Sequence, residues 1–445
     1  MNKIQASNPF FEIYSTPHGT VPFNLIKTEH YAPAIHEGIR RQNGEIDAII
    51  NNPDAPTFEN TIVPYEKSGE LLHRVNTVFG NLLSAETDDE LQELAREIMP
   101  LMSEHENNIS LNEKLFARIK TVYELADKAK LTPEQSKLLE DIYTGFVRNG
   151  ANLQGDAKEQ YRNLCKELSL LTLQFSENTL KETNDYRLVL TEKSQLSGLP
   201  ESAIDAAAET AQEKGVEGWV FTLHAPSYSP FMTYADNRDL RRELYMAYNT
   251  KCTHDNACNN LEIVKKIANI HMEIARLLGY DNFAEYNLKE RMAQNSDTVY
   301  KLLNQLLEAY TPTAQKEYDE VQALARSEEG ADFILMPWDW SYYSQKLKDR
   351  KFSINDEMLR PYFELSKVKE GIFGLASKLY GITFKKNADI PVYHKDVEAY
   401  EVFDKDGTYL AVLYTDFHPR TGKRSGAWMT SYKGQWIDEA SGENS

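Results

Sequence analysis

Apolar residues recur along this chain at a helical period over most of its length. From about Pro33 to Leu379 they stand mostly three and four residues apart, with few Gly or Pro interruptions. Such spacing is typical of helices that bury one face. After Gly381 apolar and polar residues alternate instead, which is typical of strands. The pattern therefore predicts a mainly α protein with a small β-sheet near its C-terminus.

Local signals in the sequence place several of the predicted helices. The motif TPEQ at 132–135 supplies a capping threonine, a proline suited to the first helical position and the glutamine of a capping box. Residues 133–147 are therefore predicted to be helical. A long apolar stripe predicts that residues 155–184 form one packed helix. Further helices are predicted at 237–250, 256–278 and 297–326, and a strand at 218–225.

The alternating part of the chain divides into four predicted strands. The second and third are joined by the turn DKDG at 404–407, which favours a hairpin. The four predicted strands are 381–387, 397–404, 408–417 and 423–431. In chain order the pattern predicts three regions, namely an N-terminal helical region at 1–150, a long-helix region at 151–380 and a β region at 381–445.

Composition narrows the classes of partner. The chain has 445 residues and a formal net charge of −19. Because binding to nucleic acid and to anionic membranes depends on Lys and Arg, we expect neither as a partner. Hydrophobic residues make up 41% of the sequence, yet no run of about 18 apolar residues indicates a membrane span.

The cysteines bear on the compartment. The sequence has three, Cys165, Cys252 and Cys258, which are too few for a disulfide framework and indicate a reducing environment. The first residues, MNKIQASNPFFEIYSTPHG, contain no apolar run long enough for a signal peptide. We therefore expect the protein in the cytoplasm, or in the periplasm or outside the cell if a signal peptide was removed.

No catalytic motif is complete in the residues themselves. In zinc peptidases, H-E-x-x-H places two imidazoles one helical turn apart, and the Glu activates the metal-bound water. Here HE occurs at 36–37 and at 105–106, but Arg40 and Ile109 stand where the second His would be needed. Serine nucleophile elbows, P-loops and G-x-G-x-x-G turns are also absent from the sequence.

One segment has metal-like spacing. CTHDNAC at 252–258 holds three potential ligands within seven residues. A zinc site generally needs a fourth ligand and a preformed geometry. The alternative interpretation is a pair of incidental thiols near the start of a helix.

Nine stretches in order along the chain carry a resemblance to one protein family. They are NPFFEIY, VPFNLIKTEHYAPAI, APTFENTIVPYEKSGELL, SEHENNISLNEKLFARI, NRDLRRELYMAYNT, ARLLGYDNFAEYNL, PWDWSYYSQKL, LRPYFELSKVKEGIFGLASKLYGITF and FHPRTGKRSGAWM. Together they resemble the thimet oligopeptidase and bacterial peptidyl-dipeptidase (dipeptidyl carboxypeptidase) family of zinc metallopeptidases. The resemblance runs nearly from end to end and is greatest to the peptidyl-dipeptidase branch.

The resemblance implies a fold, an activity and a cofactor. The fold it implies is a mostly helical, two-lobed clamshell of the zincin type, whose channel admits short unfolded peptides. The activity it implies is hydrolysis at a zinc held by H-E-x-x-H and a downstream Glu, with release of C-terminal dipeptides by the peptidyl-dipeptidases. Its expected partners are therefore short unfolded peptides.

The sequence departs from the family at its zinc motif. In the family that motif follows the KRSGAWM strand, and this sequence ends before reaching it. We therefore interpret the chain as the N-terminal part of such an enzyme, with no catalytic or metal-binding residue of its own, no zinc bound and no activity alone. The alternative is a natural truncated homologue that acts as a non-catalytic peptide-binding or regulatory module.

The matching strand supplies the candidate substrate contacts. In the family, the substrate backbone is thought to pair beside a Gly-Ala strand, which Gly426 and Ala427 match here, with Trp428 next to them. An edge strand offers free backbone groups, and small side chains allow close approach. Arg420, with Lys423-Arg424, is suited to orient a peptide carboxylate. The alternative for Gly426-Ala427 is an ordinary strand with Gly at a bulge.

Other matched residues have structural alternatives. The aromatic residues of PWDWSYY at 337–343 suit either a channel wall or core packing. The arginines of NRDLRREL at 237–244 suggest ion pairs within a helix or between lobes. Apolar surface left without the family's zinc-binding region is also expected to favour self-association.

Overall fold

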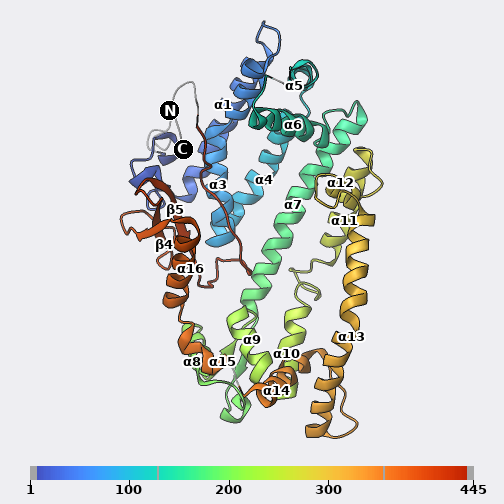
Figure 1. The fold of residues 1–445 in the computed structure, drawn as a ribbon, viewed down its shortest axis with the longest axis vertical. Helices are drawn as coiled ribbons and strands as arrows, with labels where there is room; N and C mark the ends of the chain where they lie inside the picture. Colours follow the sequence, from blue (N-terminus) through green and yellow to red (C-terminus); the bar gives the residue numbers. More distant parts are fainter. Residues whose placement is uncertain (1–7, 128–129, 354–355, 438–445) are drawn as a thin grey trace. The chain divides into compact units, whose positions relative to one another are not determined.

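The chain forms a predominantly helical protein, seen in a computed structural model that describes residues 8–127, 130–353 and 356–437 (Figure 1). It divides into two compact units. Unit 1 comprises Met1–Gln174, Lys266–Phe283 and Thr383–Ser445, and unit 2 comprises Phe175–Lys265 and Ala284–Ile382. The units therefore interleave along the chain, whereas the regions predicted from sequence follow chain order. The clamshell arrangement and the three predicted regions stay predictions.

Unit 1 is built on amphipathic helices that share two apolar cores. One core lies between the first and third helices and includes Phe10, Val75 and Phe79. The other contains Leu115, Ile119 and Phe146. The helices of this unit are α1 (Thr28–Ile50), α2 (Val63–Lys67), α3 (Glu70–Ala85), α4 (Asp89–Ser110), α5 (Glu113–Leu125) and α6 (Pro133–Arg148). Short helical turns are η2 (Pro9–Phe11), η3 (Pro17–Gly19) and η4 (Phe58–Ile62).

The helix signals read from the sequence are confirmed at both places where they were strongest. Helix α6 begins at Pro133, and the Thr132 hydroxyl and the Gln135 side chain make the reciprocal bonds of a capping box. Helix α7 (Asp156–Asp185) matches the long helix predicted at 155–184 and runs through both units. Helices α11 (Leu261–Leu277) and α12 (Phe283–Leu288) also cross unit boundaries.

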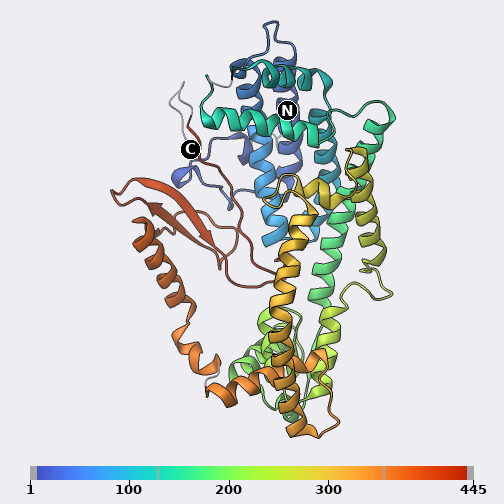
Figure 2. The same cartoon turned by 45° about the vertical axis from the view of Figure 1, so that its right-hand side comes forward.

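The C-terminal sheet has three of the four predicted strands. Strands β3 (Thr383–Lys386), β4 (Glu398–Phe403) and β5 (Tyr409–Thr415) pair antiparallel in the order β3-β4-β5, drawn in brown and red in Figure 2. The predicted turn at 404–407 is confirmed, because the Gly407 N–H donates to the Asp404 carbonyl at 3.0 Å. The pairing of β4 with β5 contains a bulge at Val402/Phe403.

The fourth predicted strand, at 423–431, is wrong. These residues have no strand assignment in the structure. Gly426 has φ +103°, outside the extended region that a continuous strand requires. In addition, the Arg424 N–H donates to the carbonyl of Ser84 in α3, so helix contacts replace a sheet ladder here.

Unit 2 has its own apolar core around a short two-stranded ladder. Strands β1 (Leu188–Leu190) and β2 (Trp219–Phe221) pair antiparallel, so the strand predicted at 218–225 is shorter than expected. The helices are α8 (Glu201–Glu213), α9 (Ala225–Tyr234), α10 (Arg238–Asn249), α13 (Ser296–Glu329), α14 (Trp340–Phe352), α15 (Asp356–Leu359) and α16 (Leu365–Tyr380). Short turns are η5 (Lys193–Leu196), η6 (Pro337–Asp339) and η7 (Arg360–Tyr362).

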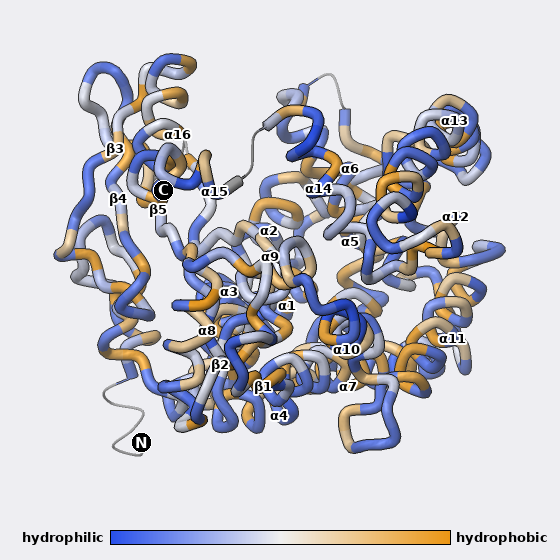
Figure 3. The backbone as a smooth tube through the Cα atoms, turned by 90° about the horizontal axis from the view of Figure 1, so that it is seen from below, coloured by the Kyte–Doolittle hydropathy of each residue, from blue (hydrophilic) through white to orange (hydrophobic). Residues whose placement is uncertain are grey.

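Hydropathy follows the helical period that the sequence predicted. Figure 3 shows hydrophobic and hydrophilic positions alternating along the helices of both units. Within the described residues, no helix combines the length and the apolar character needed to cross a bilayer.

A close contact between α1 and α3 in unit 1 leads to a prediction. A Cβ added at Gly38 in α1 would lie 2.9 Å from the Cα of Leu72 in α3, which real Cβ atoms essentially never show. We expect Gly38→Ala to lower the free energy of unfolding by about 1–3 kcal/mol through overpacking. Gly44→Ala in the same helix has open space around its Cβ and should raise it by about 0.5–1 kcal/mol. Urea denaturation followed by circular dichroism measures both, and equal effects would contradict the packing argument.

Candidate functional site

Backbone hydrogen bonds connect the residues after β5 to the end of α3. The Thr87 N–H donates to the Gly422 carbonyl at 2.8 Å, and the Arg424 N–H donates to the Ser84 carbonyl at 2.9 Å. Segments more than 300 residues apart in the sequence thus lie side by side within unit 1. This segment, residues 416–432, contains every substrate-contact residue predicted from the sequence.

The carboxylate of Asp416 accepts hydrogen bonds from three side chains in and beside this segment. Arg420 donates to both Asp416 oxygens, at 2.9 Å each, and Lys423 Nζ donates to Oδ1 at 2.9 Å and to the Asp416 carbonyl at 2.8 Å. The Tyr393 hydroxyl donates to Oδ2 at 3.0 Å. The Arg420 guanidinium also donates to the carboxylate of Glu86 and to the carbonyl of Ala85, which ties the cluster to α3.

This arrangement perturbs the titration of Asp416. Burial alone would raise the pKa of the carboxyl group, but hydrogen bonds from Arg420, Lys423 and Tyr393 outweigh it and lower the pKa to about 2. Burial acts to lower the pKa of the Arg420 guanidinium. The hydrogen bonds to Asp416 and Glu86 outweigh this effect and raise that pKa. Asp416 and Arg420 are therefore both ionised at neutral pH.

The predicted substrate contacts differ in how accessible they are. Gly426 and Ala427 are exposed, and a Cβ on Gly426 would meet no atom within 4 Å. Trp428 is half-buried beneath the Arg424 guanidinium, whose central carbon lies 4.4 Å from a Trp428 ring centroid. Arg420, by contrast, is engaged by acceptors of the protein itself. The structure brings all four residues into one segment, and their contact with peptide stays a prediction.

An aromatic cluster supports the segment, and sequence reasoning missed it. Phe23 packs edge-on against Tyr393, Tyr414 and Tyr432, with ring centroids 5.3, 6.0 and 5.5 Å away. The Tyr432 hydroxyl is hydrogen bonded to the Asn81 side chain in α3. Asp416 and Phe23 were not singled out from the sequence, because only tertiary contacts between distant segments reveal their role.

The cysteine segment at 252–258 has a different environment. The Cys252 N–H donates to the Glu182 carboxylate of α7, and the Asn256 side chain donates to the same group at 3.3 Å. Burial and the neighbouring Glu182 raise the pKa of Cys252 to about 11. Across the described part of the chain, no cluster of three His, Cys, Asp or Glu side chains has an arrangement that could hold a metal ion.

A cavity of about 650 Å³ lies beside this segment in unit 2. Its walls include the acidic side chains of Glu182, Asp185 and Glu243, together with His254 and Tyr186. Apolar side chains, among them Leu223, Met246 and Ala247, also line it. The Glu182 carboxylate already accepts a hydrogen bond from the backbone of the cysteine segment. It offers no set of groups for the metal-dependent hydrolysis that the resemblance implies.

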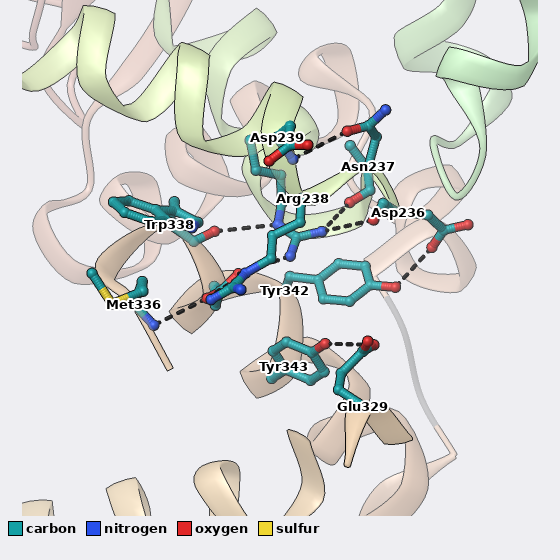
Figure 4. A network of polar contacts seen from close by, with 12 residues as sticks. Asp236, Asn237, Arg238, Asp239, Glu329, Met336, Trp338, Tyr342 and Tyr343 are labelled. Carbon is teal, nitrogen blue, oxygen red and sulfur yellow. Dashed lines mark hydrogen bonds and ion pairs between the residues drawn. The ribbon is translucent and has the colours of Figure 1, made fainter. Parts of the chain in front are cut away.

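Two arginines of α10, Arg238 and Arg241, form an ion cluster with Asp339 within unit 2. Figure 4 shows the network around Arg238. Asp339 is 0% exposed, and its carboxylate accepts hydrogen bonds from Arg238 Nη2 at 2.7 Å and from Arg241 Nη2 at 3.0 Å. Arg241, itself 1% exposed, also donates to the carbonyls of Ala235 and Trp338, at 2.7 and 3.2 Å. Asp339 and Arg241 are both buried and hydrogen bonded to groups of the protein, so we assign the cluster a structural role.

Neighbouring groups keep Asp339 charged despite its burial. Burial acts to raise the pKa of the carboxyl group, but hydrogen bonds from Arg238, the Met336 backbone and Arg241 outweigh it and lower the pKa. The Arg241 guanidinium also lies over the Tyr342 ring, 4.1 Å from its centroid. For Tyr342 and Tyr343, both buried, the core-packing interpretation of the sequence agrees with the structure.

The Asp416 cluster predicts a pH-dependent loss of stability. We expect Asp416→Asn to lower the free energy of unfolding at pH 7 by about 2–3 kcal/mol, because Lys423 loses its carboxylate partner and Arg420 keeps only that of Glu86. The pKa in the folded state, about 2, is below that of an unfolded Asp, about 3.9. The contribution is therefore complete above about pH 4 and is lost as the pH falls toward about 2. Denaturation of wild type and variant across this range should show the two stabilities converging.

Asp389→Asn is the matched control for this variant, because Asp389 is exposed and belongs to the same unit. It should change the free energy of unfolding by less than about 0.5 kcal/mol at every pH. A constant difference between wild type and Asp416→Asn down to pH 2 would contradict the assigned role of the carboxylate.

The buried cluster in unit 2 makes a separate prediction. Asp339→Ala leaves Arg241 buried without its carboxylate, and we expect it to lower the free energy of unfolding by about 3–5 kcal/mol. Asp332→Ala, which removes an exposed carboxylate seven residues earlier, is the control. Thermal and urea denaturation measure the difference, and similar values for the two variants would refute a structural ion cluster.

Comparison with known proteins extends the evidence from geometry. The family model described as "Peptidase family M3" matches residues 231–443. The chain is 36% identical over 427 residues to the protein named dipeptidyl carboxypeptidase of Escherichia coli (strain K12), covering 96% of this chain and 63% of that protein. It is 33% identical over 433 residues to oligopeptidase A of Salmonella typhimurium, again covering 96% of this chain and 63% of that protein.

A third comparison agrees with these. Oligopeptidase A of Escherichia coli (strain K12) is 34% identical over 424 residues, which cover 94% of this chain and 62% of that protein. The chain thus spans less than two thirds of the length of these relatives. The similarity covers nearly all of the sequence, as the nine stretches predicted. The chain belongs to the thimet oligopeptidase and peptidyl-dipeptidase family, peptidase family M3.

Proposed function

We propose that this chain is the N-terminal part of a zinc-dependent peptidase that hydrolyses short peptides, releasing dipeptides from their C-termini. The observation that carries the proposal is the 36% identity to a dipeptidyl carboxypeptidase over 96% of the chain. Short unfolded peptides are its proposed partners. The three cysteines are free thiols, which supports a reducing compartment such as the cytoplasm.

The zinc chemistry belongs to residues outside this sequence. H-E-x-x-H does not occur in the 445 residues, and the described side chains form no cluster that could hold the metal. The residues present therefore do not fit a catalytic zinc, and no step through the metal is derived from them. We propose that this chain contributes scaffold and peptide contacts, while metal-activated water is supplied by the part that carries the motif.

The proposed peptide contacts are in the segment that Asp416 anchors. Gly426 and Ala427 are exposed on a stretch of irregular backbone, where small side chains permit close approach of a peptide main chain. Trp428 offers an aromatic surface beside them, held under Arg424. Main-chain contacts of this kind tolerate many side chains, which suits a peptidase that acts on varied peptides.

A second candidate is a non-catalytic peptide-binding module. The exposed Gly426-Ala427 stretch and the poor fit of the described residues to zinc are both compatible with it. The two candidates differ in the DNA that follows the codon for Ser445. An open reading frame that continues into H-E-x-x-H supports the peptidase, and a stop codon supports the module.

The proposal predicts that the 445-residue chain does not cleave peptides. The purified chain, incubated with equimolar zinc and short synthetic peptides, should release no dipeptide above the buffer blank by mass spectrometry. The intact dipeptidyl carboxypeptidase of Escherichia coli, assayed in parallel, is the positive control. Release of dipeptides by the 445-residue chain that a chelator abolishes would overturn the assignment of the chemistry to another part.

A further inference from the structure

The pair Asn-Gly occurs twice in the sequence, and the two copies lie in different backbone surroundings. Asn43-Gly44 lies inside α1, with helical residues on both sides. Asn149-Gly150 comes directly after Arg148, the last residue of α6. Both asparagines are exposed, and both pairs belong to unit 1. The conformation of the backbone is therefore the main difference between them.

An asparagine followed by glycine can lose its side-chain amide without an enzyme. The backbone nitrogen of the glycine gives up its proton and attacks Cγ of the asparagine. A bond from that nitrogen to Cγ forms, the Cγ–Nδ2 bond breaks, and ammonia leaves with the proton. Water then opens the five-membered ring, giving aspartate if the new bond breaks and isoaspartate if the original peptide bond breaks. Glycine favours the attack because it has no side chain to hinder its nitrogen.

The helix around Asn43 opposes this reaction. A side chain in an α-helix leans toward the helix N-terminus, away from the N–H of the next residue. The Gly44 N–H is in addition hydrogen bonded within the helix, which extends from Thr28 to Ile50. Attack at Asn43 therefore requires the interior of α1 to open first, which is a costly step of local unfolding.

The backbone at Asn149 offers less resistance. Asn149 has left the helical region, with φ −94° and ψ 23°. The Gly150 N–H donates to the Val147 carbonyl at 3.2 Å. The Ala151 N–H donates to the Phe146 carbonyl at 3.0 Å, which completes the two bonds of a Schellman motif. Helix ends fray, so the bond of the Gly150 N–H opens at a lower cost than a bond inside α1.

The fold also requires a glycine at position 150. Gly150 has φ +86°, in the left-handed region that favours glycine. A Cβ at this position would lie 2.9 Å from Cδ1 of Leu153 and 3.2 Å from Cδ2 of Leu111. The end of α6 thus needs the residue type that leaves the preceding asparagine most open to attack.

We propose that Asn149 is a site of spontaneous deamidation, converted to aspartate and isoaspartate in the folded protein, while Asn43 stays intact. The Asn149 side chain donates to the Gly145 carbonyl at 2.9 Å, and conversion removes this hydrogen bond. The new carboxylate lies at the C-terminal end of α6, where the helix dipole is negative, so it destabilises the helix. Isoaspartate also lengthens the backbone beside the closely packed Gly150.

The test is incubation of the purified 445-residue chain at mildly alkaline pH, followed by digestion and mass spectrometry of the peptides around both pairs. We expect conversion at Asn149 to be at least about tenfold faster than at Asn43, because the cost of opening α1 slows attack exponentially. In the chain unfolded by urea the two rates should become similar, because the helix no longer protects Asn43.

Two variants at position 149 complete the test. Asn149→Gln keeps an amide on a longer side chain that cannot form the five-membered ring, so it should abolish conversion there and leave Asn43 unchanged. Asn149→Asp reproduces one product. It should lower the midpoint of thermal unfolding by about 1–3 °C relative to Asn149→Gln.

Three results would overturn the proposal. The first is an Asn149 that stays intact in the folded chain, and the second is equal conversion of Asn149 and Asn43 in the folded chain. The third is a ratio of rates that does not change in urea, because the difference would then come from neighbouring residues and not from the fold. Equal midpoints for Asn149→Asp and Asn149→Gln would refute the assigned effect on α6.

Discussion

The ionised carboxylate of Asp416 is the point on which the last described part of unit 1 depends. It accepts hydrogen bonds from Arg420, Lys423 and the Tyr393 hydroxyl. Arg420 also donates to the Glu86 carboxylate, just after the end of α3. Without this group, Lys423 would lie in a largely buried position with no carboxylate partner, and Arg420 would keep only that of Glu86. Together with the backbone bonds of Gly422 and Arg424 to the end of α3, this interaction holds the chain between β5 and Tyr432, where Gly426 and Ala427 lie.

Unit 2 contains a similar cluster of ion pairs, centred on Asp339. Asp339 joins α10 to the turn before α14 through Arg238 and Arg241, in an interior where apolar contacts alone would leave the arginines unpaired. In both units a buried acid fixes the course of the backbone, and each arginine also binds main-chain carbonyls. In both clusters the arginine charges, that of Arg420 among them, are paired with carboxylates of the protein itself.

Much of the fold follows from local sequence. The capping box at Thr132 and the apolar stripe of α7 predicted their helices closely, because capping and amphipathic burial are local or periodic effects. The predicted strand at 423–431 failed for the opposite reason. Its composition suits a strand, but the φ of Gly426 and the bond from Arg424 to Ser84 are set by contacts with a helix over 300 residues earlier in the sequence.

The sequence predicted where the candidate site lies in the chain, but it did not predict which residues hold that segment in place. Family motifs indicated the segment around Gly426, while nothing local distinguishes Asp416 from the many other acidic residues of a chain whose net charge is −19. The arginines of α10 were expected to form ion pairs, but their shared acid lies about 100 residues away. The interleaving of the two units also depends on long-range packing that periodicity does not encode.

We propose that this chain carries the scaffold of a family M3 peptidase without its metal site. Equilibrium dialysis against zinc at neutral pH, followed by elemental analysis of the protein, tests it most directly. The account predicts far less than one tightly bound zinc per chain after dialysis, with no change in the folded state when a chelator is added. One zinc per chain that is retained through dialysis and released by chelator would contradict it.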